Sequence, residues 1–447
     1  MKVYKWEEEG ENLVEYKKSM YNNMITSRIK KDKTEYLIYN SSTGAMAWLE
    51  KWVYSAMAEW NISVLKKEKF FNELQRNGFV VLKEVNEYFN YMFKAKSFAL
   101  DKHSDFASYI VAPTMRCNLK CLYCFEECNN DTSIMSEDML EAVYLFITKN
   151  VMKESKHRLN INWFGGEPLL AYKQIKNLSK KLISFCDNHK IEYRASVVTN
   201  GTLLTKSILE ELIDECRVKH FQISFDGESA EYQRMKKATN ENFNRAIQSI
   251  EMISKSCAGI SVRLNVCYEN KDSLLHLAKK IVKISDFHGI MYAGKIMKYD
   301  NKQDYSEISA KDFEIFENNL NEYASTYSEY QRYVKKSLNP KGASCGYMVK
   351  NRCLIDPHGR LYRCEHHIND IHYVIGDVIN GFYRNELDYM FVLGDLPDKC
   401  QKCSIMPICM GGCSSDRILH QKFVNCDYMK RKLVENCILV EKLKHSG

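Results

Sequence analysis

Short apolar runs alternate with amphipathic stretches through the middle of the chain. The runs have the length and composition of buried strands and lie at residues 109–112, 159–163, 195–199, 221–225, 262–266 and 290–293. Helical periodicity occurs between or after them, at residues 137–151, 172–186, 206–215, 242–255, 273–284 and 313–327. Six strand–helix units in succession predict an α/β protein with a parallel sheet, most simply a partial (β/α)6 TIM-like barrel over residues 105–330.

The two flanking blocks have different patterns. Residues 1–98 predict a strand at 36–39, helices at 46–57 and 65–74, and a strand at 79–82 after Gly78, which is the outline of a small winged-helix domain. The third block, residues 340–447, begins at the breaker Asn339-Pro340-Lys341-Gly342. It is rich in loops and has little long periodicity, as expected of a domain held together by metal.

Charge and hydropathy exclude several classes of partner. The 447 residues contain 64 Lys and Arg against 57 Asp and Glu, and the basic runs are short and interrupted, so no nucleic acid is expected. No apolar stretch approaches the length of a membrane span, and the N-terminus lacks the apolar core of a signal peptide. We therefore expect a cytoplasmic protein with no membrane partner. A reducing cytosol disfavours disulfides, so the 17 cysteines, nine of them within residues 340–447, indicate metal binding or catalysis.

The first cysteine motif directly follows the first predicted barrel strand. Cys117, Cys121 and Cys124 form a C-x3-C-x2-C pattern on the loop at the carboxyl end of that strand, where the active sites of such barrels gather. Three thiolates on one tight loop can bind three irons of a [4Fe–4S] cube and leave the fourth iron for a small molecule. A structural zinc loop that lacks its fourth ligand is the alternative.

This motif, including the aromatic Tyr123, resembles the signature of the radical S-adenosylmethionine (SAM) family. The resemblance implies that the three cysteines hold a cluster to which SAM binds, and that one electron splits SAM to give a 5′-deoxyadenosyl radical. Three later segments, each at the end of a predicted strand, resemble family segments that contact SAM: Phe164-Gly165-Gly166-Glu167-Pro168 for its amino group, and Thr199-Asn200-Gly201 and Ser224-Phe225-Asp226-Gly227 for its ribose and carboxylate. The family often has a basic residue after the fourth strand, and the spacing does not choose between Arg234 and Lys236, for each of which a plain exposed charge is the alternative.

The C-terminal cysteines form a second pattern. Cys400-x2-Cys403-x5-Cys409-x3-Cys413, with Cys426 after it and Cys345, Gly359 and Cys364 before it, resembles the SPASM domain, which holds auxiliary [4Fe–4S] clusters. The resemblance implies three clusters in all. It assigns Cys345, Cys353, Cys364 and Cys413 to auxiliary cluster I, and Cys400, Cys403, Cys409 and Cys426 to auxiliary cluster II. Cys353 is the weakest member, because its spacing varies in such domains; without it, cluster I has an open iron for a substrate thiolate. A pair of zinc sites is the alternative.

Other candidate residues lie near these motifs. Glu365 follows Cys364 at the position where sulfatase-maturating relatives have an acid that takes the substrate proton, and a solvated carboxylate is the alternative. His366 and His367 are candidate metal ligands, and a polar loop is the simpler explanation of them. Cys128 is close to the first motif in sequence, whereas packing roles are expected for the remaining cysteines: Cys186, Cys216, Cys257, Cys267 and Cys437.

The N-terminal block resembles the recognition element of enzymes that mature ribosomal peptides (RiPPs), which bind a leader peptide as an added strand. DNA binding by a winged helix is the alternative, and the mixed charge of the block disfavours it. Together the resemblances imply a radical SAM peptide maturase that forms a thioether between a cysteine sulfur and a carbon. Its partners would be a precursor peptide, whose leader binds the N-terminal domain, and a flavodoxin- or ferredoxin-type electron donor. Carbon–carbon cross-linking, epimerisation, a sulfatase-maturating oxidase and a non-enzymatic zinc scaffold remain as alternatives.

Overall fold

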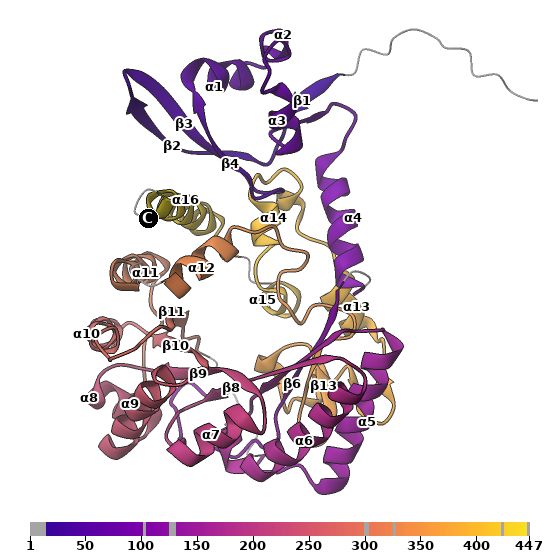
Figure 1. The fold of residues 1–447 in the computed structure, drawn as a ribbon, viewed down its shortest axis with the longest axis vertical. Coiled ribbons are helices and arrows are strands. Elements are labelled where there is room, and N and C mark those ends of the chain that lie inside the picture. Colours follow the sequence, from indigo (N-terminus) through magenta and orange to yellow (C-terminus); the bar gives the residue numbers. More distant parts are fainter. Residues whose placement is uncertain are drawn as a thin grey trace, which may run out of the picture.

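The protein is described here from a computed structural model, which covers residues 15–101, 104–124, 131–298, 304–324, 328–421 and 424–444. Figure 1 shows a small N-terminal domain at one end, a barrel at the other, and C-terminal segments both between them and along the side of the barrel. The polypeptide therefore passes from the N-terminal domain to the barrel and then returns.

The barrel contains six parallel strands in sequence order, each hydrogen-bonded to the next. The strands are β6 (Phe106–Val111), β7 (Arg158–Trp163), β8 (Glu192–Thr199), β9 (Val218–Phe225), β10 (Gly259–Val266) and β11 (Ile290–Lys295). The helices are α5 (Glu137–Lys153), α6 (Tyr172–Asn188), α7 (Lys206–Asp214), α8 (Ser229–Lys236), α9 (Asn240–Ser254), α10 (Lys271–Ile281), α11 (Ala310–Ala324) and α12 (Ser328–Ser337), with a 3-10 turn η2 (Pro168–Ala171). The predicted partial barrel is confirmed.

Successive side chains of each barrel strand point to opposite faces of the sheet. One face packs in the apolar core under the helices, and the other lines the interior of the barrel. In β7, Leu159, Ile161 and Trp163 are fully buried in one cluster with apolar residues of α5 and α6. Asn160 and Asn162 point to the opposite face and remain partly accessible. Ser196 of β8 donates a hydrogen bond of 3.0 Å to Asn162, so the interior wall is polar. The helices thus cover an apolar outer face, and the interior is left for chemistry.

The C-terminal segment extends the sheet of the barrel. Strand β12 pairs in parallel with β6, and β13, β14 and β15 follow as antiparallel neighbours, which gives a sheet of ten strands. Their bounds are β12 (Cys353–Ile355), β13 (Arg360–Tyr362), β14 (Gly376–Asp377) and β15 (Gly381–Phe382). The helical elements are η3 (Glu365–His367), η4 (Ile371–Tyr373), α13 (Glu386–Leu393), η5 (Asp398–Cys400), α14 (Met406–Cys409), α15 (Ser414–Leu419) and α16 (Cys426–Lys444).

The expectation of little long periodicity in this segment was wrong for its last part. Helix α16 has 19 residues, and Leu433, Cys437 and Val440 form its buried stripe. One of these three positions is a cysteine. A search for apolar periodicity that does not count cysteine as apolar therefore misses the stripe.

The N-terminal domain contains a three-stranded antiparallel sheet, three short helices and a two-stranded pair. Its elements are β1 (Tyr16–Lys18), β2 (Asn22–Lys30), β3 (Lys33–Asn40), β4 (Met46–Glu50), α1 (Lys51–Ala58), α2 (Ile62–Leu65), α3 (Phe71–Arg76), β5 (Val80–Leu82) and α4 (Glu87–Ala99). The strands expected at 36–39 and 79–82 are present. That the domain is a winged helix stays a prediction.

Two helix predictions in this domain were wrong in part. Residues 46–50 form strand β4, because Met46 and Trp48 pack toward α16 whereas Ala47 and Leu49 pack toward α1, an alternation of period two. The helix predicted at 65–74 is interrupted, since α2 ends at Leu65 and α3 begins at Phe71. Helix α4 was not predicted, and the boundary expected at residue 98 falls within it.

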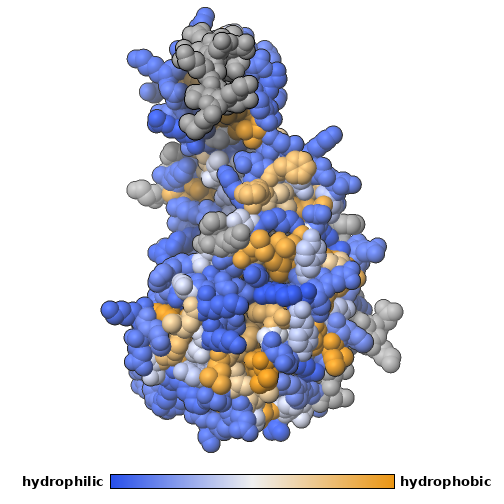
Figure 2. All heavy atoms as spheres, turned by 90° about the vertical axis from the view of Figure 1, so that its right-hand side faces the viewer, coloured by the Kyte–Doolittle hydropathy of each residue, from blue (hydrophilic) through white to orange (hydrophobic). Residues whose placement is uncertain are grey.

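Helix α4 runs along the molecule from the N-terminal domain toward the barrel and packs against α13 (Figure 1). Seen from that side, hydrophobic side chains gather over the flank that α4 and α13 form, on an otherwise largely hydrophilic surface (Figure 2). Phe89 and Phe93 of α4 and Tyr389 of α13 are among the exposed ones. Among the described residues, no helix combines the length and the apolarity needed to cross a membrane.

Candidate functional site

The loop that carries Cys117, Cys121 and Cys124 lies beyond the end of β6 and is held from the side by α8. The backbone N–H of Leu122 donates to the carbonyl of Met235 at 2.8 Å, and that of Lys120 donates to the carbonyl of Lys236 at 3.2 Å. All three thiols are at least partly accessible. The loop therefore presents three sulfurs from one short segment, as a cluster with an open iron requires. Cys128 lies outside the described residues.

Gly165 and Gly166 allow the segment after β7 to pack on the backbone that leads into this loop. A Cβ atom on Gly165 would collide with the carbonyl oxygen of Thr114, and one on Gly166 would collide with the carbonyls of Met115 and Arg116. Gly165 also has a φ of 117°, in the region that glycine tolerates. Only glycine fits at both positions, so this segment is fixed against the base of the cysteine loop.

Glu167 connects the ends of two barrel strands. Its buried carboxylate accepts hydrogen bonds from the backbone N–H of Asn200 at 2.8 Å, the hydroxyl of Thr199 at 2.8 Å and the N–H of Leu169 at 3.1 Å. Burial raises the pKa of Glu167, and these hydrogen bonds oppose that rise. The side chain of Glu167, a residue of the segment expected to contact SAM, thus holds the ends of β7 and β8 together.

Asn200 extends this connection to the cysteine loop. Its amide nitrogen donates to the side-chain oxygen of Asn118 at 2.9 Å and lies 4.0 Å from the sulfur of Cys117. Its own side-chain oxygen accepts from the N–H of Thr202 at 2.9 Å. Asn118 was not predicted as a site residue, although it lies inside the cysteine motif.

The structure distinguishes the two basic candidates after β9. The side chain of Lys236 is 2% exposed, and its ammonium donates to the hydroxyl of Ser224 at 2.8 Å and pairs with Asp226 at 3.3 Å. Arg234 instead pairs with Glu231 at 3.0 Å near the surface and donates to the carbonyl of Asp304. Lys236, with Ser224, therefore faces the candidate site, and Arg234 does not.

Lys236 also influences the cysteine loop directly. Burial raises the pKa of Cys121 to about 11, and Lys236 opposes that rise. Because iron binds the thiolate, the lysine favours the form of Cys121 that ligation needs. Tyr123 of the same loop accepts a hydrogen bond of 2.9 Å from Asn265 on β10. Asn265 was not singled out from the sequence; the alternation along β10 is the signal that points it inward.

Four C-terminal cysteines converge on one place. Burial, then the neighbouring thiols of Cys403, Cys409 and Cys426, raise the pKa of Cys400 to about 11, so all four lie within electrostatic range of one another. They come from η5, the turn after it, α14 and the first residue of α16. These are the residues expected to hold auxiliary cluster II.

A second group contains Cys345, Cys364 and Cys413. Burial is the main cause that raises the pKa of Cys364 to about 12, and Glu365, Cys413 and Cys345 add to it. Glu365 likewise raises the pKa of Cys345. The carboxylate that was predicted to take a proton therefore lies near the thiols of Cys345 and Cys364, in the η3 turn that begins beside Cys364.

Cys353 is not brought together with this group. It begins β12, is fully buried and shares the outer apolar core with Tyr109 and Ile355. Leu354 pairs with Tyr362 across the β12–β13 hairpin and packs on the opposite face with Ile110. Because successive side chains of a strand point to opposite faces, Tyr362 and Cys364 point to the inner face of the hairpin, whereas Cys353 points outward.

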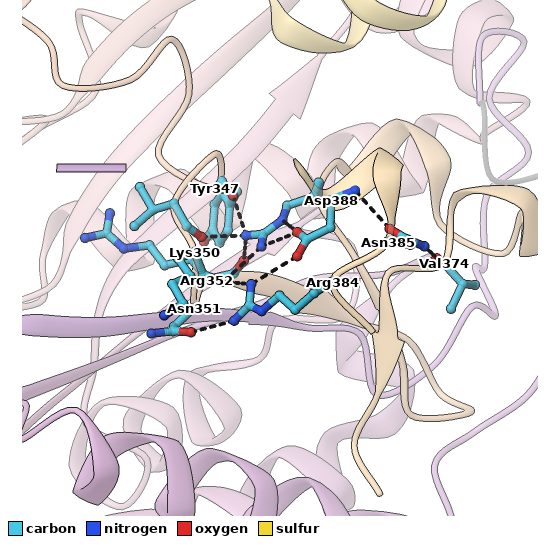
Figure 3. A network of polar contacts seen from close by, with 10 residues as sticks. Tyr347, Lys350, Asn351, Arg352, Val374, Arg384, Asn385 and Asp388 are labelled. Carbon is cyan, nitrogen blue, oxygen red and sulfur yellow. Dashed lines mark hydrogen bonds and ion pairs between the residues drawn. The ribbon is translucent and has the colours of Figure 1, made fainter. Parts of the chain in front are cut away.

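A buried ionic network fixes the chain between Cys345 and Cys364 (Figure 3). The guanidinium of Arg363 pairs with Asp388 and donates to the backbone carbonyls of Tyr347, Val349, Lys350 and Arg352. Arg384 approaches the same carboxylate at 3.0 Å from nearer the surface. Because one arginine satisfies four carbonyls of the loop, the position of Cys345 is tied to that of Cys364.

The thiol groups fit iron–sulfur cubes. No cysteine of the described residues is in a disulfide. Within the same residues, no three His, Cys, Asp or Glu side chains are close enough to chelate one metal ion. A [4Fe–4S] cube takes one thiolate on each iron, so its ligands stand further apart than those of a single ion. The sets of three, three and four thiols suit that arrangement.

Comparison with known proteins agrees with the barrel and its first cysteine loop. Residues 111–281 match the Radical SAM superfamily. The barrel is a radical SAM domain. Several relatives of this radical SAM enzyme are named as enzymes. A cysteine-type anaerobic sulfatase-maturating enzyme of Clostridium novyi is 24% identical over 69% of this chain and 88% of its own length. A radical SAM cyclopropyl synthase of Paramaledivibacter caminithermalis is 19% identical over 90% of this chain and 91% of its own.

Solved structures share the fold of this radical SAM enzyme. The protein anSMEcpe, with bound AdoMet and a peptide, superposes with a TM-score of 0.57 at 20% identity, covering 76% of this chain and 100% of that one. SuiB of Streptococcus suis, bound to its precursor peptide SuiA, gives 0.51 at 16% identity, covering 89% and 95%. At these identities the likeness concerns the fold.

Proposed function

We propose that this radical SAM enzyme modifies a ribosomally made precursor peptide and joins a cysteine sulfur of that peptide to a carbon atom in a thioether. Cys117, Cys121 and Cys124 would hold the SAM cluster, and Ser224 and Lys236 would bind the SAM carboxylate. SAM, when bound there, supplies a 5′-deoxyadenosyl radical that takes hydrogen from a C–H bond. The side chains of the barrel interior would orient the peptide beside it and exclude water.

The group of Cys345, Cys364 and Cys413 carries the thioether proposal. Glu365 lies within electrostatic range of the thiols of Cys345 and Cys364, while Cys353 faces the other side of the hairpin. A cube held by three cysteines has one iron without a protein thiolate, and a substrate cysteine is the natural fourth ligand. The peptide would then present its sulfur at one side of the interior and its C–H bond to SAM at the other.

The formation of a thioether determines which atoms and electrons must be removed from the peptide. Joining sulfur to carbon takes two hydrogens from the peptide: one as a hydrogen atom, the other as a proton and an electron. Glu365 would accept the proton from the substrate thiol, and Cys345, Cys364 and Cys413 would hold a cluster able to take up the electron. Cys400, Cys403, Cys409 and Cys426 would hold a third cube, and a flavodoxin- or ferredoxin-type protein would supply the electron that starts each turnover.

The length of the relatives supports a peptide maturase with a recognition domain. The cyclopropyl synthase matches 90% of this chain, and SuiB, whose structure includes a precursor peptide, covers 89%. The N-terminal sheet β2–β3–β4 would bind the leader as an added strand.

A second candidate is maturation of a sulfatase. Enzymes of this kind match about two thirds of the chain, and Glu365 lies beside Cys364 where their acid is expected. The product would be an aldehyde in the target protein, and it would form without a leader peptide.

Mass spectrometry of products separates the two. The enzyme should be co-expressed anaerobically with short cysteine-containing peptides encoded beside its gene, and incubated separately with a sulfatase-derived peptide. The thioether proposal expects a loss of two hydrogens together with a cysteine that no longer reacts with iodoacetamide. A mass loss with an alkylatable cysteine would contradict it, and an aldehyde on the sulfatase peptide would favour the second candidate. Cys117→Ala should abolish 5′-deoxyadenosine formation in either case.

A further inference from the structure

Three side chains form one row across the interior of the barrel. Arg263 of β10 is in register with Ser224 of β9 on one side and with Tyr292 of β11 on the other. Side chains in register on neighbouring parallel strands point to the same face. Ser224 already accepts a hydrogen bond from Lys236. Arg263 therefore lies beside the proposed SAM site, on the side toward β11.

The guanidinium of Arg263 is held flat by its own strand and the next one. Its Nε donates to the side-chain oxygen of Asn265 at 3.0 Å. A Cβ atom on Gly294 would lie 2.6 Å from that Nε, 3.0 Å from one Nη and 3.1 Å from Cζ. The group thus rests against the bare backbone of Gly294, and any side chain at 294 would displace it.

Arg263 has a positive charge without a protein anion to match it. Within the described residues, no carboxylate lies at ion-pair distance from its guanidinium; Nε donates to Asn265, and the side chain also hydrogen-bonds to the phenol of Tyr292. The residue is half-buried. A half-buried guanidinium on the interior face of β10 that has no paired carboxylate can bind one, which it can engage with two parallel hydrogen bonds.

The surroundings place this charge opposite the group of Cys345, Cys364 and Cys413. Burial raises the pKa of Tyr292; Arg263 opposes that rise, and Glu365 adds to it, so both charges lie near the phenol. The hydroxyl of Tyr292 donates to Gln222 at 2.6 Å, which fixes the ring in the interior. A substrate between β10–β11 and the η3 turn would thus have a cation on the barrel side and Glu365 on the other.

The SAM carboxylate already has a cation. Lys236 acts on Cys121 of the first cysteine loop and holds Ser224. Arg263 is tied to that loop only indirectly, through Asn265 and then Tyr123. In the proposed function, a carboxylate of the peptide can therefore pair with Arg263.

We propose that Arg263, seated on Gly294, binds a carboxylate of the substrate peptide and so selects an acidic group near the residue that is modified. This inference rests on the proposed peptide substrate. The carboxylate is either an Asp or Glu side chain or the C-terminus of the peptide. Arg263 acts here as a positioning and specificity residue.

Synthetic pentapeptides test the proposal. The probes are Ac-Ala-Cys-Ala-Asp-Ala-NH2, its Asn counterpart without any carboxylate, and Ac-Ala-Cys-Ala-Asn-Ala-OH, whose only carboxylate is terminal. Their affinities are measured by calorimetry with the reconstituted enzyme and SAM. At least one acidic peptide should bind about tenfold tighter than the neutral one, the scale of one charge-assisted pair. The peptide that shows this preference identifies the source of the carboxylate.

Two variants separate the roles. Arg263→Met should remove the preference while the affinity for SAM changes less than about threefold, because Lys236 remains. Gly294→Ala should weaken the preference while the arginine is retained. Arg332→Met, on the exposed face of α12, is the matched control and should behave as the wild type.

Three results would overturn the proposal: equal affinity of the wild type for all three peptides, binding of none of them at millimolar concentration, or an Arg263→Met variant that keeps the preference. A tenfold loss of SAM affinity in that variant would reassign Arg263 to SAM. All of these can occur while 5′-deoxyadenosine is still formed and the precursor is still modified, so they are distinct from a failure of the proposed function.

Discussion

Two thiols on one β-hairpin, Cys353 and Cys364, face opposite sides of the sheet. A strand turns successive side chains to alternate faces, and the pairing of Leu354 with Tyr362 sets the phase on both strands. To reach the cluster proposed at Cys364, Cys353 would have to leave the core that it shares with Tyr109. The geometry of a single strand thus favours three ligands over four in the proposed cluster.

The iron content of the protein after anaerobic reconstitution tests whether Cys353 is a cluster ligand. Cys353→Ala should keep about 12 iron atoms per chain, the number for three cubes. Cys364→Ala should lose about four of them. Each variant removes one cysteine thiol from the same hairpin region, so the two variants serve as controls for each other. Equal loss of iron in both would mean that Cys353 is a ligand after all.

The role of Arg363 depends on the groups to which its guanidinium is bonded. The ion pair of Arg363 with Asp388 is almost fully buried, with both side chains at most 3% exposed. Arg363→Met would leave that buried carboxylate with only the more exposed Arg384 as a partner, and would leave four backbone carbonyls without their donor. A loss of about 3–5 kcal/mol in the free energy of unfolding is expected for such a broken pair.

Denaturant titration of the reconstituted protein would measure this loss. Arg384→Met is the matched control, since Arg384 meets the same carboxylate but is 39% exposed, and its cost should be well below half as large. If both variants lost the same stability, the network would not depend on burial. Neither arginine has a sequence pattern that announces its role.

Residues whose chemistry depends on spacing along the chain could be predicted. The thiols of Cys117, Cys121 and Cys124 share one loop, as expected. The partners of Glu167 could not be predicted, because Thr199 and Asn200 meet its carboxylate only when β7 and β8 lie side by side. Nor could the sequence choose Lys236 over Arg234: the two lie on the same short helix, and the choice depends on which of them faces the sheet.

At the scale of elements, the barrel strands and helices were predictable because each has a strong period of its own. Every predicted barrel strand overlaps an observed one, since buried β-branched and aromatic runs bounded by turns leave little choice. The N-terminal domain was harder. The alternation in β4 extends over only five residues, and a window long enough to see a helix averages it with α1. Short elements take their structure from what they pack on.

His220 on β9 gives the barrel a dependence on pH. Its ring is held by Ser261 of β10 at 2.9 Å, and burial lowers the pKa of His220 below its usual value. In the window between that lowered value and the ordinary one, the unfolded chain binds the proton and the folded chain does not. The free energy of unfolding therefore decreases as the pH falls through this window.

His220→Gln removes the titrating group and keeps a polar partner for Ser261. The loss of stability between roughly pH 7 and roughly pH 5 should be shallower in this variant than in the wild type. Chemical denaturation at several pH values would show it. His276→Gln, on the exposed face of α10, should leave the slope unchanged. Parallel curves for wild type and His220→Gln would remove His220 as a cause.

At the scale of the whole molecule, the N-terminal domain packs on the segment that carries Cys400, Cys403 and Cys409. Ile25, Leu37 and Tyr39 of its sheet share one core with Ile405 and Ile408. Tyr21 of the domain and Met92 and Ala95 of α4 share another with Leu396, Cys400, Met406 and Met410. Asn23 and Ser404 are also hydrogen-bonded, at 2.6 Å. The three blocks that composition separates are thus joined through two common cores.

This packing changes what a truncation would do. Removing residues 1–98 would expose both cores around α14 and delete nearly all of α4, so the four thiols proposed for auxiliary cluster II would lose the surface that holds their loops. We expect the truncated protein to bind about eight iron atoms where the full chain binds about 12. The cluster at Cys117, Cys121 and Cys124 should survive, because α8 and the ends of β7 and β8 hold its loop, and SAM cleavage should persist.

Iron analysis and 5′-deoxyadenosine formation, measured on the same preparation, test this expectation. Trp52→Ala, on the outer side of the N-terminal domain, leaves both shared cores intact and should keep all the iron. A truncated protein with a full complement of iron would mean that the C-terminal segment folds alone and that the first 98 residues serve recognition only. Loss of about four irons would instead mean that any binding of a leader peptide takes place on a domain that also supports a redox centre, so that docking of the leader and the environment of that centre are physically coupled.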